Sequence, residues 1–213
     1  MDGYDYDPSQ PKWPLRRIIK YVIYTISVLV YLILFIRFFG ACDAGFSEKI
    51  LLDESAAKIL EETGSLGARR IDLETNENDE GRIQTVYVVY LEDTLDFQVT
   101  LKCNSRYYPI SGKEAEYRFV LRRLSGEEIS FVSADYIDST KRLGYDYARL
   151  SFSGISYEKD DSLALLIYRA KEWDEISDKD YSSLQPLASI KVYANDCYSK
   201  SITPSKSDLE YIE

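Results

Sequence analysis

The sequence predicts a mostly β protein in which an antiparallel two-sheet sandwich follows one transmembrane helix and a short connecting helix. A long apolar run stands near the N-terminus, apolar and polar residues alternate at many places after Ala68, and turn signals separate these stretches. The 213 residues, 45% apolar and 29% charged, suffice for one folded domain and an anchor. We expect boundaries at 1–17, 18–40, 41–67, 68–195 and 196–213.

Residues 18–40 are predicted to form the transmembrane helix. Residues 21–36 carry no charge, and with their flanks they reach about 20 residues, the length that crosses about 30 Å of hydrocarbon. The alternative is a buried core helix. Such a helix normally keeps a polar stripe, and this run has only Thr25 and Ser27.

Charge predicts the orientation of this helix. Residues 1–40 carry five basic and three acidic side chains, whereas the remainder carries 21 basic and 33 acidic ones. The basic residues on the N-terminal side are Lys12, Arg16, Arg17 and Lys20. Because basic flanks stay in the cytoplasm, we expect a single-pass protein of the cell membrane, with residues 1–17 cytoplasmic and everything after Gly40 outside. The acidic body argues against nucleic acid as a partner.

The residues at the end of the apolar run indicate whether the segment is cleaved as a signal peptide. A secretory signal has an apolar region of about 7–15 residues and small residues at its cleavage site. Here residues 37–42 read Arg-Phe-Phe-Gly-Ala-Cys, which begins with a charge and two bulky rings. We therefore expect an uncleaved anchor. Residues 39–42 loosely resemble a lipobox, so lipidation of Cys42 is the alternative, and both readings tether the domain to a membrane.

Residues 41–67 are predicted to be a connector with a short helix. Ser47 or Asp53 can cap the start of the helix, and Gly64 follows its end. The apolar residues that would share one face are Leu52, Ala56, Ile59 and Leu60. This face lacks the basic border of helices that lie on membranes, so we expect it to pack on the following domain.

Eight strands are predicted in residues 68–195, where Val, Ile, Tyr, Phe and Leu recur with a period of two. They cover residues 70–73, 84–91, 95–103, 115–124, 128–134, 147–154, 162–169 and 187–194. Short strands at this spacing favour two packed antiparallel sheets over alternating strands and helices. A helix is expected only around residues 171–176. The polar tail, residues 196–213, is expected to be loosely ordered.

Two of these stretches resemble paired late strands of immunoglobulin-like or fibronectin-like modules. They read YARLSFSGI at 147–155 and LALLIY at 163–168. The resemblance implies an immunoglobulin-like sandwich. The whole layout also resembles membrane-anchored extracytoplasmic proteins of Gram-positive bacteria. Both resemblances rest on architecture and imply no functional residue.

The three cysteines form no Cys-x-x-Cys pair, which argues against a zinc ribbon or a thiol redox motif. Cys103 ends one predicted strand and Cys197 follows another, so a disulfide between them would close a long loop and stabilise the domain by about 3 kcal/mol. Because the number of cysteines is odd, two unpaired thiols are the preferred interpretation. Cys42 can alternatively pair with its counterpart in a second chain.

The sequence predicts no catalytic centre, cofactor or metal site. It contains no histidine, which excludes Ser-His-Asp and Cys-His catalysis and imidazole ligands. Acidic clusters at 76–81, 158–161 and 172–180 offer the oxygen ligands that Ca²⁺ prefers. The first fails the EF-hand pattern, because Tyr87 stands where a glutamate is required. Solvated turns are the preferred interpretation, and a calcium-stabilised adhesion module is an alternative.

The candidate interaction surface consists of tyrosines beside cations. Segments 106–109 and 141–147 contain Tyr107, Tyr108, Tyr145 and Tyr147, and Trp173 stands in an acidic stretch. Rigid aromatic rings with arginine are typical of contact surfaces between proteins. The alternative is that the tyrosines fold over the ends of the sandwich and that Trp173 covers its core.

These observations make a non-enzymatic function the first hypothesis. The domain would bind a protein or an envelope component at the cell surface. The alternative is an accessory subunit of a membrane complex, assembled through the transmembrane helix. In that case the polar residues that would form hydrogen bonds between helices are Tyr24, Thr25, Ser27 and Tyr31.

Overall fold

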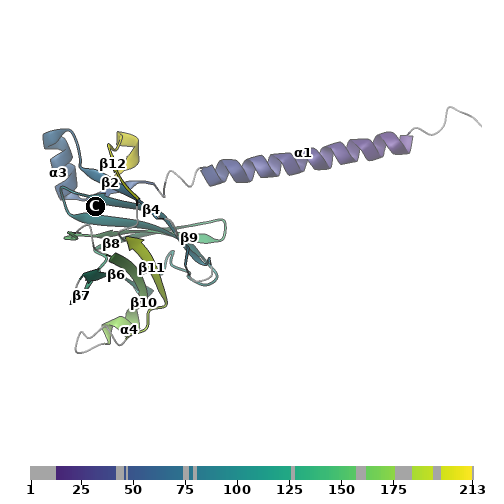
Figure 1. The fold of residues 1–213 in the computed structure, drawn as a ribbon. Coiled ribbons are helices and arrows are strands. Elements are labelled where there is room, and N and C mark those ends of the chain that lie inside the picture. Colours follow the sequence, from purple (N-terminus) through teal and green to yellow (C-terminus); the bar gives the residue numbers. More distant parts are fainter. Residues whose placement is uncertain are drawn as a thin grey trace, which may run out of the picture. The chain divides into compact units, whose positions relative to one another are not determined.

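The computed structural model describes residues 13–41, 46, 48–73, 77–78, 81–125, 128–156, 162–175, 184–193 and 198–212. The chain divides into two compact units, Met1–Ala44 and Gly45–Glu213. The first unit contains the long helix α1, and the strands of the described residues belong to the second (Figure 1).

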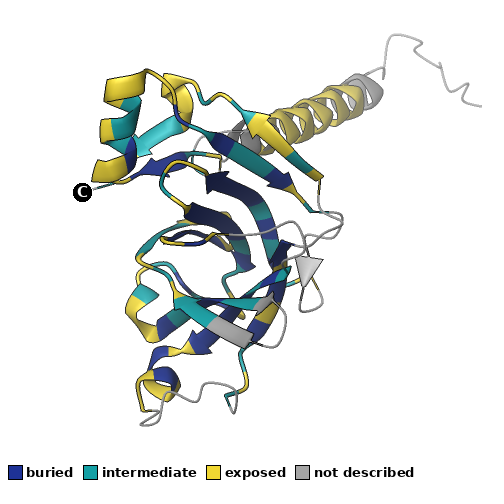
Figure 2. Cartoon of the chain, turned by 60° about the vertical axis from the view of Figure 1, so that its left-hand side comes forward, coloured by how far each residue is buried: buried dark blue, intermediate teal, exposed yellow. Residues whose placement is uncertain are grey.

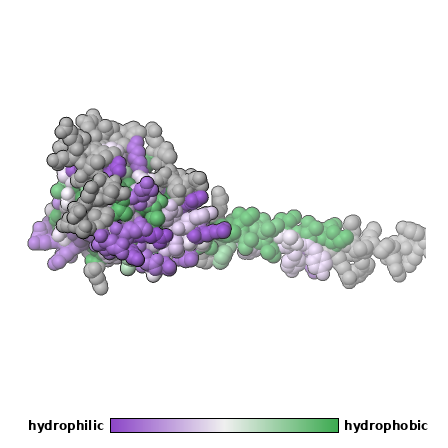
Figure 3. Space-filling model, turned by 90° about the horizontal axis from the view of Figure 1, so that it is seen from below, coloured by the Kyte–Doolittle hydropathy of each residue, from purple (hydrophilic) through white to green (hydrophobic). Residues whose placement is uncertain are grey.

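Helix α1, Trp13–Ala41, contains the predicted apolar run. Its window Ile18–Ile36 has a mean hydropathy of 2.2, and none of its 19 residues is buried. Figure 3 shows this helix coloured mostly as hydrophobic. By length and composition α1 can cross a membrane, although a signal sequence near the N-terminus has the same properties. The Thr25 hydroxyl donates to the Tyr21 carbonyl within the helix at 2.9 Å.

The second unit is a β-sandwich with short helical elements. In chain order, its described elements are β1 (Ile50–Leu52), α3 (Glu54–Thr63), β2 (Ala68–Asp72), β3 (Glu77–Asn78), β4 (Ile83–Leu91), β5 (Asp96–Asn104), η1 (Glu114–Glu116), β6 (Tyr117–Ser125), β7 (Glu128–Ser133), β8 (Tyr136–Arg142), β9 (Tyr145–Phe152), β10 (Ser162–Arg169), α4 (Ala170–Asp174), β11 (Ala188–Tyr193), β12 (Tyr198–Ile202), η3 (Lys206–Asp208) and β13 (Leu209–Tyr211).

The main strands form two antiparallel sheets. The larger sheet has the order β12-β2-β4-β5-β9-β8, with β3 beside β4, and the smaller has the order β11-β10-β6-β7. Successive hairpins alternate between the sheets: β4–β5 and β8–β9 belong to the larger, and β6–β7 and β10–β11 to the smaller. This arrangement confirms the predicted two-sheet antiparallel sandwich after an N-terminal helix.

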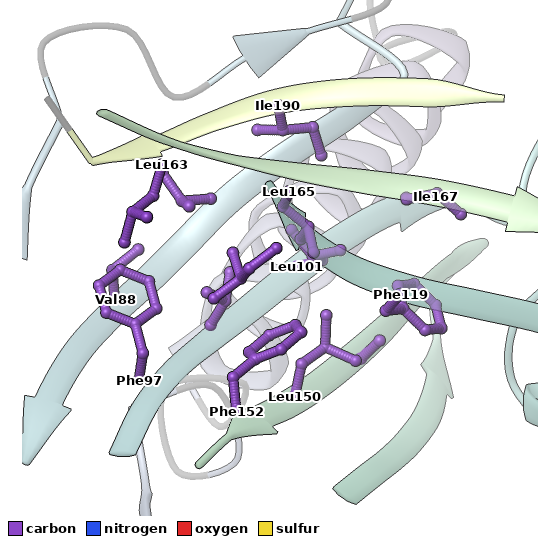
Figure 4. Close-up of a cluster of buried hydrophobic side chains, with 14 of the residues drawn as sticks. Val88, Phe97, Leu101, Phe119, Leu150, Phe152, Leu163, Leu165, Ile167 and Ile190 are labelled. Atoms are coloured by element: carbon purple, nitrogen blue, oxygen red, sulfur yellow. The ribbon is translucent and has the colours of Figure 1, made fainter. Parts of the chain in front are cut away.

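The main core lies between the two sheets. Figure 4 shows Phe97, Leu101 and Phe152 of the larger sheet facing side chains of the smaller one, among them Phe119 and Leu165. All five are at most 1% exposed. The alternation read from the sequence is confirmed, because alternate residues of three strands belong to this core: Phe97, Val99, Leu101 and Cys103 of β5, Tyr117, Phe119 and Leu121 of β6, and Ala148, Leu150 and Phe152 of β9.

Helix α3 packs on the outer face of the larger sheet. The Asp53 side chain caps it by accepting a hydrogen bond from the Ala56 backbone nitrogen at 2.7 Å, and Gly64 ends it with a φ of 74°. Ala56 is buried, whereas the outward turns of α3 are exposed (Figure 2). The apolar cluster beneath α3 includes Ile50, Leu52, Leu66, Ala68, Tyr87, Val89 and Leu91. The prediction that this connector packs on the domain is therefore confirmed.

The C-terminal tail is folded, which corrects the expectation of a loosely ordered segment. Strand β12 pairs with β2 in antiparallel fashion, and β13 pairs with β1 in parallel. Ile202 and Leu209 pack against the cluster under α3. The tail looks polar in sequence because only isolated apolar residues face the domain, while its order comes from backbone pairing.

Buried polar groups hold β1 on the sheet. The Gln98 side-chain amide donates to the Leu51 carbonyl at 2.7 Å, and its carbonyl accepts from the Leu51 nitrogen at 2.9 Å. Gln98 thus binds β1 as a neighbouring strand would. Asp96 accepts from Gln98 at 2.6 Å and from the Ser151 hydroxyl at 2.7 Å. Burial raises the pKa of Asp96 above its usual value, and these hydrogen bonds partly oppose the shift.

Arg149 fastens the start and the end of the domain to the sheet. Its side chain is only 3% exposed and lies between Asp138 of β8 and Glu210 of β13. The Arg149 Nη1 atom donates to Glu210 Oε2 at 2.7 Å. The guanidinium also lies 4.0 Å from the centre of the Phe46 ring. One buried cation therefore links β8, β9 and β13 with the first described residue of the unit.

Strand β8 was not predicted from the sequence. Its residues are half-buried or exposed, and they include only two large apolar side chains, Tyr136 and Ile137. It forms one edge of the larger sheet, where a strand needs a single partner and less apolar character. Helix α4, by contrast, overlaps the range around residues 171–176 where a helix was expected.

Candidate functional site

The two tyrosine-bearing segments predicted from the sequence meet at one end of the larger sheet. β5 and β9 are paired, so Asn104 lies opposite Tyr145. Beyond the pairing, the Ser105 backbone nitrogen donates to the Gly144 carbonyl at 3.1 Å. The loop after β5 and the β8–β9 hairpin therefore form one continuous structure.

Asp146 anchors this end of the sheet. The residue is 1% exposed. It accepts hydrogen bonds from the Ser105 hydroxyl and, at 2.9 Å, from the Ser111 backbone nitrogen. Asn104 adds a local turn, because its side-chain oxygen accepts from the Arg106 nitrogen at 3.0 Å. The loop that carries Tyr107 is thus held at several points.

Replacing the anchor is expected to destabilise the domain and loosen this loop. Asp146→Ala leaves the Ser105 and Ser111 donors without their acceptor, so the free energy of unfolding should fall by about 2 kcal/mol. Urea unfolding followed by tryptophan fluorescence, with limited trypsin digestion at Arg106, measures both effects. Asp146→Asn keeps one acceptor oxygen and should lose less. Equal losses in the two variants would contradict the anchoring role.

The β8–β9 hairpin presents an apolar side chain at its tip. Leu143 and Gly144 form a two-residue loop with φ angles of 48° and 84°, as a type I′ turn requires. Asn or Gly is preferred at such positions, and a leucine in this conformation costs about 1 kcal/mol. Leu143 is nevertheless 70% exposed. Because so little of the Leu143 side chain is buried, its packing within the domain does not offset this conformational cost.

Two tyrosines beside the hairpin are exposed and in contact with cations. Tyr107 is 49% and Tyr145 is 39% exposed. The Arg82 guanidinium lies 4.3 Å from the centre of the Tyr107 ring, and the Lys102 ammonium lies 4.4 Å from that of Tyr145. Such contacts hold both partners in a defined position. We call the set Arg82, Lys102, Tyr107, Leu143 and Tyr145 the tyrosine surface.

The other predicted surface residues are buried. Tyr147 is 6% exposed, and Tyr108 is 8% exposed with its hydroxyl donating to the Leu187 carbonyl at 3.3 Å. Trp173 is 9% exposed and lies 5.0 Å from the Tyr168 ring, in a small cluster on the outer side of β10. The sequence indicated which tyrosines stand near loops, but it did not show which of them are buried.

Cys103 is a buried free thiol that belongs to the main core. Burial, with a smaller contribution from the nearby Asp146 charge, raises its pKa to about 12. A thiol with such a pKa is a poor nucleophile. Cys42 and Cys197, which the alternative interpretations of lipidation and of a disulfide involve, lie outside the described residues.

Most residues of the acidic clusters lie outside the described residues, among them Asp79, Glu158 and Asp178. Of the third cluster, Asp174 forms an ion pair with Arg118 at 2.8 Å. Among the residues that the structure describes, no group of three or more metal-ligating side chains is found. A hollow of about 230 Å³ lies beside Leu121, Ile155 and Leu163, below the usual size of a ligand pocket.

Comparisons with protein families, curated proteins and solved structures found no match. The function therefore has to be argued from the surface itself.

Proposed function

We propose that the chain is a single-pass membrane protein whose β-sandwich is a non-enzymatic module that binds a protein or envelope partner through the tyrosine surface. The clustering of exposed Tyr107, Leu143 and Tyr145 on firmly held loops supports this proposal. Aromatic residues and arginine dominate binding hot spots, and a rigid loop loses little entropy when a partner binds.

We propose further that α1 is retained as the anchor, with the N-terminus in the cytoplasm and the domain outside it. The apolar window of α1 and the basic residues before it support this orientation. Proteolysis of intact cells should then remove the domain and spare α1.

The strand order supports an immunoglobulin-like assignment of the sandwich. In immunoglobulin-like modules, strands A, B, E and D form one sheet, and C and C′ join F and G in the other. With β4 as strand A, the sequence β4-β5-β9-β8 and the sequence β11-β10-β6-β7 follow that order. The assignment places the loop with Tyr107 between B and C. The usual B–F disulfide and strand-C tryptophan are absent from β5, β6 and β10.

A photoreactive residue at position 143 tests the binding function. We expect it to crosslink to a partner in native membranes, because Leu143 stands at the tip of the proposed surface. Position 95 is the matched control. Leu95 is also an exposed leucine, at 41%, with a positive φ of 56°, but its turn joins β4 to β5 at the opposite end of these strands. Equal crosslinking at 95 and 143 would refute the tyrosine surface as the binding site.

One observation favours a second candidate function, a subunit assembled through α1. Tyr24, Ser27 and Tyr31 lie along one side of the helix, together with Val28 and Phe35. Hydroxyl groups inside a membrane stabilise helix association when they form hydrogen bonds with a neighbouring helix. Exchange of residues 18–36 for an unrelated apolar span separates the two functions within the same experiment. Crosslinking at position 143 survives for a surface binder and disappears for a helix-assembled subunit.

A further inference from the structure

The outer face of the smaller sheet, which points away from the main core, carries three cations. Along β6, β7, β10 and β11 the residues of this face alternate with the residues of the core. The outward residues whose side chains the structure describes are Arg118, Val120, Arg122, Phe131, Ser133, Ser162, Ala164, Leu166, Tyr168, Ser189 and Lys191. None of these is acidic, so any carboxylate that pairs with the cations has to come from outside these strands.

Two of the three cations are already engaged. Arg118 pairs with Asp174 of α4 at 2.8 Å, and Lys191 has an interaction of its own. Helix α4 follows β10 directly, where β10 pairs with the start of β6, and it brings three carboxylates to that end of the sheet: Glu172, Asp174 and Glu175. Arg122 stands four residues after Arg118 along β6, which is about 13 Å at the rise of an extended strand.

Arg122 differs from the other two cations. Within the part of the chain that the structure describes, its buried Nε atom has no hydrogen-bond partner and its guanidinium forms no ion pair. The charge of Arg122 opposes the rise that burial causes in the pKa of Tyr168, but a neutral phenol is not a counter-ion. Arginine often packs its aliphatic part on apolar neighbours. A buried charged donor without an acceptor destabilises a fold, however, so packing alone does not account for this side chain.

We infer that the outer face of the smaller sheet is a second binding surface, in which Arg122 receives a carboxylate from an acidic side chain of a partner protein. A planar guanidinium binds a carboxylate through two parallel hydrogen bonds, which would give the buried Nε atom its acceptor. The surroundings leave access for such a side chain. Arg122 lies opposite Ala164, the smallest of the outward residues, and on its other side opposite the half-buried Phe131.

The shape of this face favours a protein over a small molecule as the partner. Phe131 is half-buried near the middle of the face, and the exposed Ser133 and Ser189 stand on the two edge strands, β7 and β11. An apolar centre with a polar rim is typical of protein interfaces, whereas small molecules usually bind in concave pockets. This surface belongs to the smaller sheet and the tyrosine surface to the larger one, so the two can be tested separately.

Photocrosslinking from position 133 tests the inference. A photoreactive residue replaces Ser133 in the full chain in native membranes, and position 55, an exposed serine on α3, is the matched control. The test variant is Arg122→Met, which keeps an unbranched apolar side chain but removes the donors. Lys58→Met is the control for charge, since Lys58 is 73% exposed on α3. The urea midpoint of each full-chain variant in detergent is measured in parallel.

We expect a protein adduct at position 133 whose yield falls about tenfold or more in Arg122→Met and is unchanged in Lys58→Met. The urea midpoint of Arg122→Met should equal or exceed that of the wild type, because the Nε atom that is removed has no acceptor in the fold. Crosslinking at position 143 should be the same in both chains.

Several results would overturn the inference. One is a wild-type yield at position 133 no higher than at position 55, and another is an unchanged yield at 133 in Arg122→Met. A lowered urea midpoint, or a parallel fall at position 143, would show that Arg122 supports the domain as a whole. Adducts with lipid instead of protein would exclude the proposed partner. The tyrosine surface stands or falls independently, on the comparison of positions 143 and 95 in the wild-type chain.

Discussion

Arg149→Met is expected to lower the free energy of unfolding by about 3 kcal/mol. The guanidinium of Arg149 is almost fully buried and pairs with Asp138 and Glu210. Removing it leaves two carboxylates close together without a cation and removes the contact with Phe46. Because the carboxylates are partly exposed, the loss of unfolding free energy should lie near the lower end of the range for breaking a buried ion pair. Urea unfolding of the full chain in detergent measures it.

The same variant should change the response to acid. The hydrogen bond from Arg149 lowers the pKa of Glu210 below its usual value. A carboxyl group with a lowered pKa in the folded state stabilises the fold above its unfolded pKa, and this stabilisation is lost as pH falls through the folded pKa. Stability of the wild-type chain should therefore drop more steeply between about pH 5 and pH 3 than that of Arg149→Met.

Arg70→Met is the matched control. Arg70 also contacts a carboxylate, Asp72, and a ring, that of Tyr87, but its side chain is 43% exposed. Its loss should cost less than about 1 kcal/mol. A similar loss in both arginine variants would show that burial of Arg149 does not matter.

Phe119→Ala is expected to cost about 3–5 kcal/mol of unfolding free energy. The Phe119 side chain is 1% exposed and lies in the core between the sheets (Figure 4). Its truncation leaves a cavity lined by both sheets, which backbone pairing within each sheet prevents from closing. Trp173, buried on β10's outer side, reports unfolding of the domain by its fluorescence.

Phe131→Ala provides the comparison for this core substitution. Phe131 stands on the neighbouring strand β7 of the same sheet but is only half-buried. Its truncation should cost about 1–2 kcal/mol, because less apolar area is lost. If Phe119→Ala proved no more harmful than Phe131→Ala, the core would not lie where the two sheets face each other.

The alternating strands and the apolar helix could be predicted from sequence because each is a local pattern. β5 shows this best, since Phe97, Val99, Leu101 and Cys103 all face the core as their spacing requires. The Asp53 cap of α3 and the end of this helix at Gly64 could be predicted in the same way. Strand β8 was not predicted, because an edge strand carries little apolar alternation. The tail was not predicted, because β12 and β13 pair with β2 and β1, which are distant in sequence.

Only part of the candidate site could be predicted from the sequence. The sequence located tyrosines beside cations, and the structure brings Tyr107 and Tyr145 to one end of the sheet. Tyr108, Tyr147 and Trp173 are buried. Leu143 was missed, although a Leu-Gly pair between two polar strand ends is a usable sign of an exposed hairpin tip. Tyr145 and Tyr147 share one face of β9, yet they are 39% and 6% exposed, because burial depends on what packs over each ring, which a single strand's sequence does not reveal.

The parallel pair of β1 and β13 has a consequence for biogenesis. Ile50 lies opposite Leu209, so β1 cannot form its pair until a segment about 160 residues further along the chain has been synthesised. Contacts between such distant segments form slowly, because a long loop must close first. A nascent chain whose β13 is still inside the ribosome therefore cannot complete its fold. We expect the domain to mature only once β13 has left the ribosome, and a stop codon shortly before Leu209 should leave an unfinished product exposed to quality-control proteases.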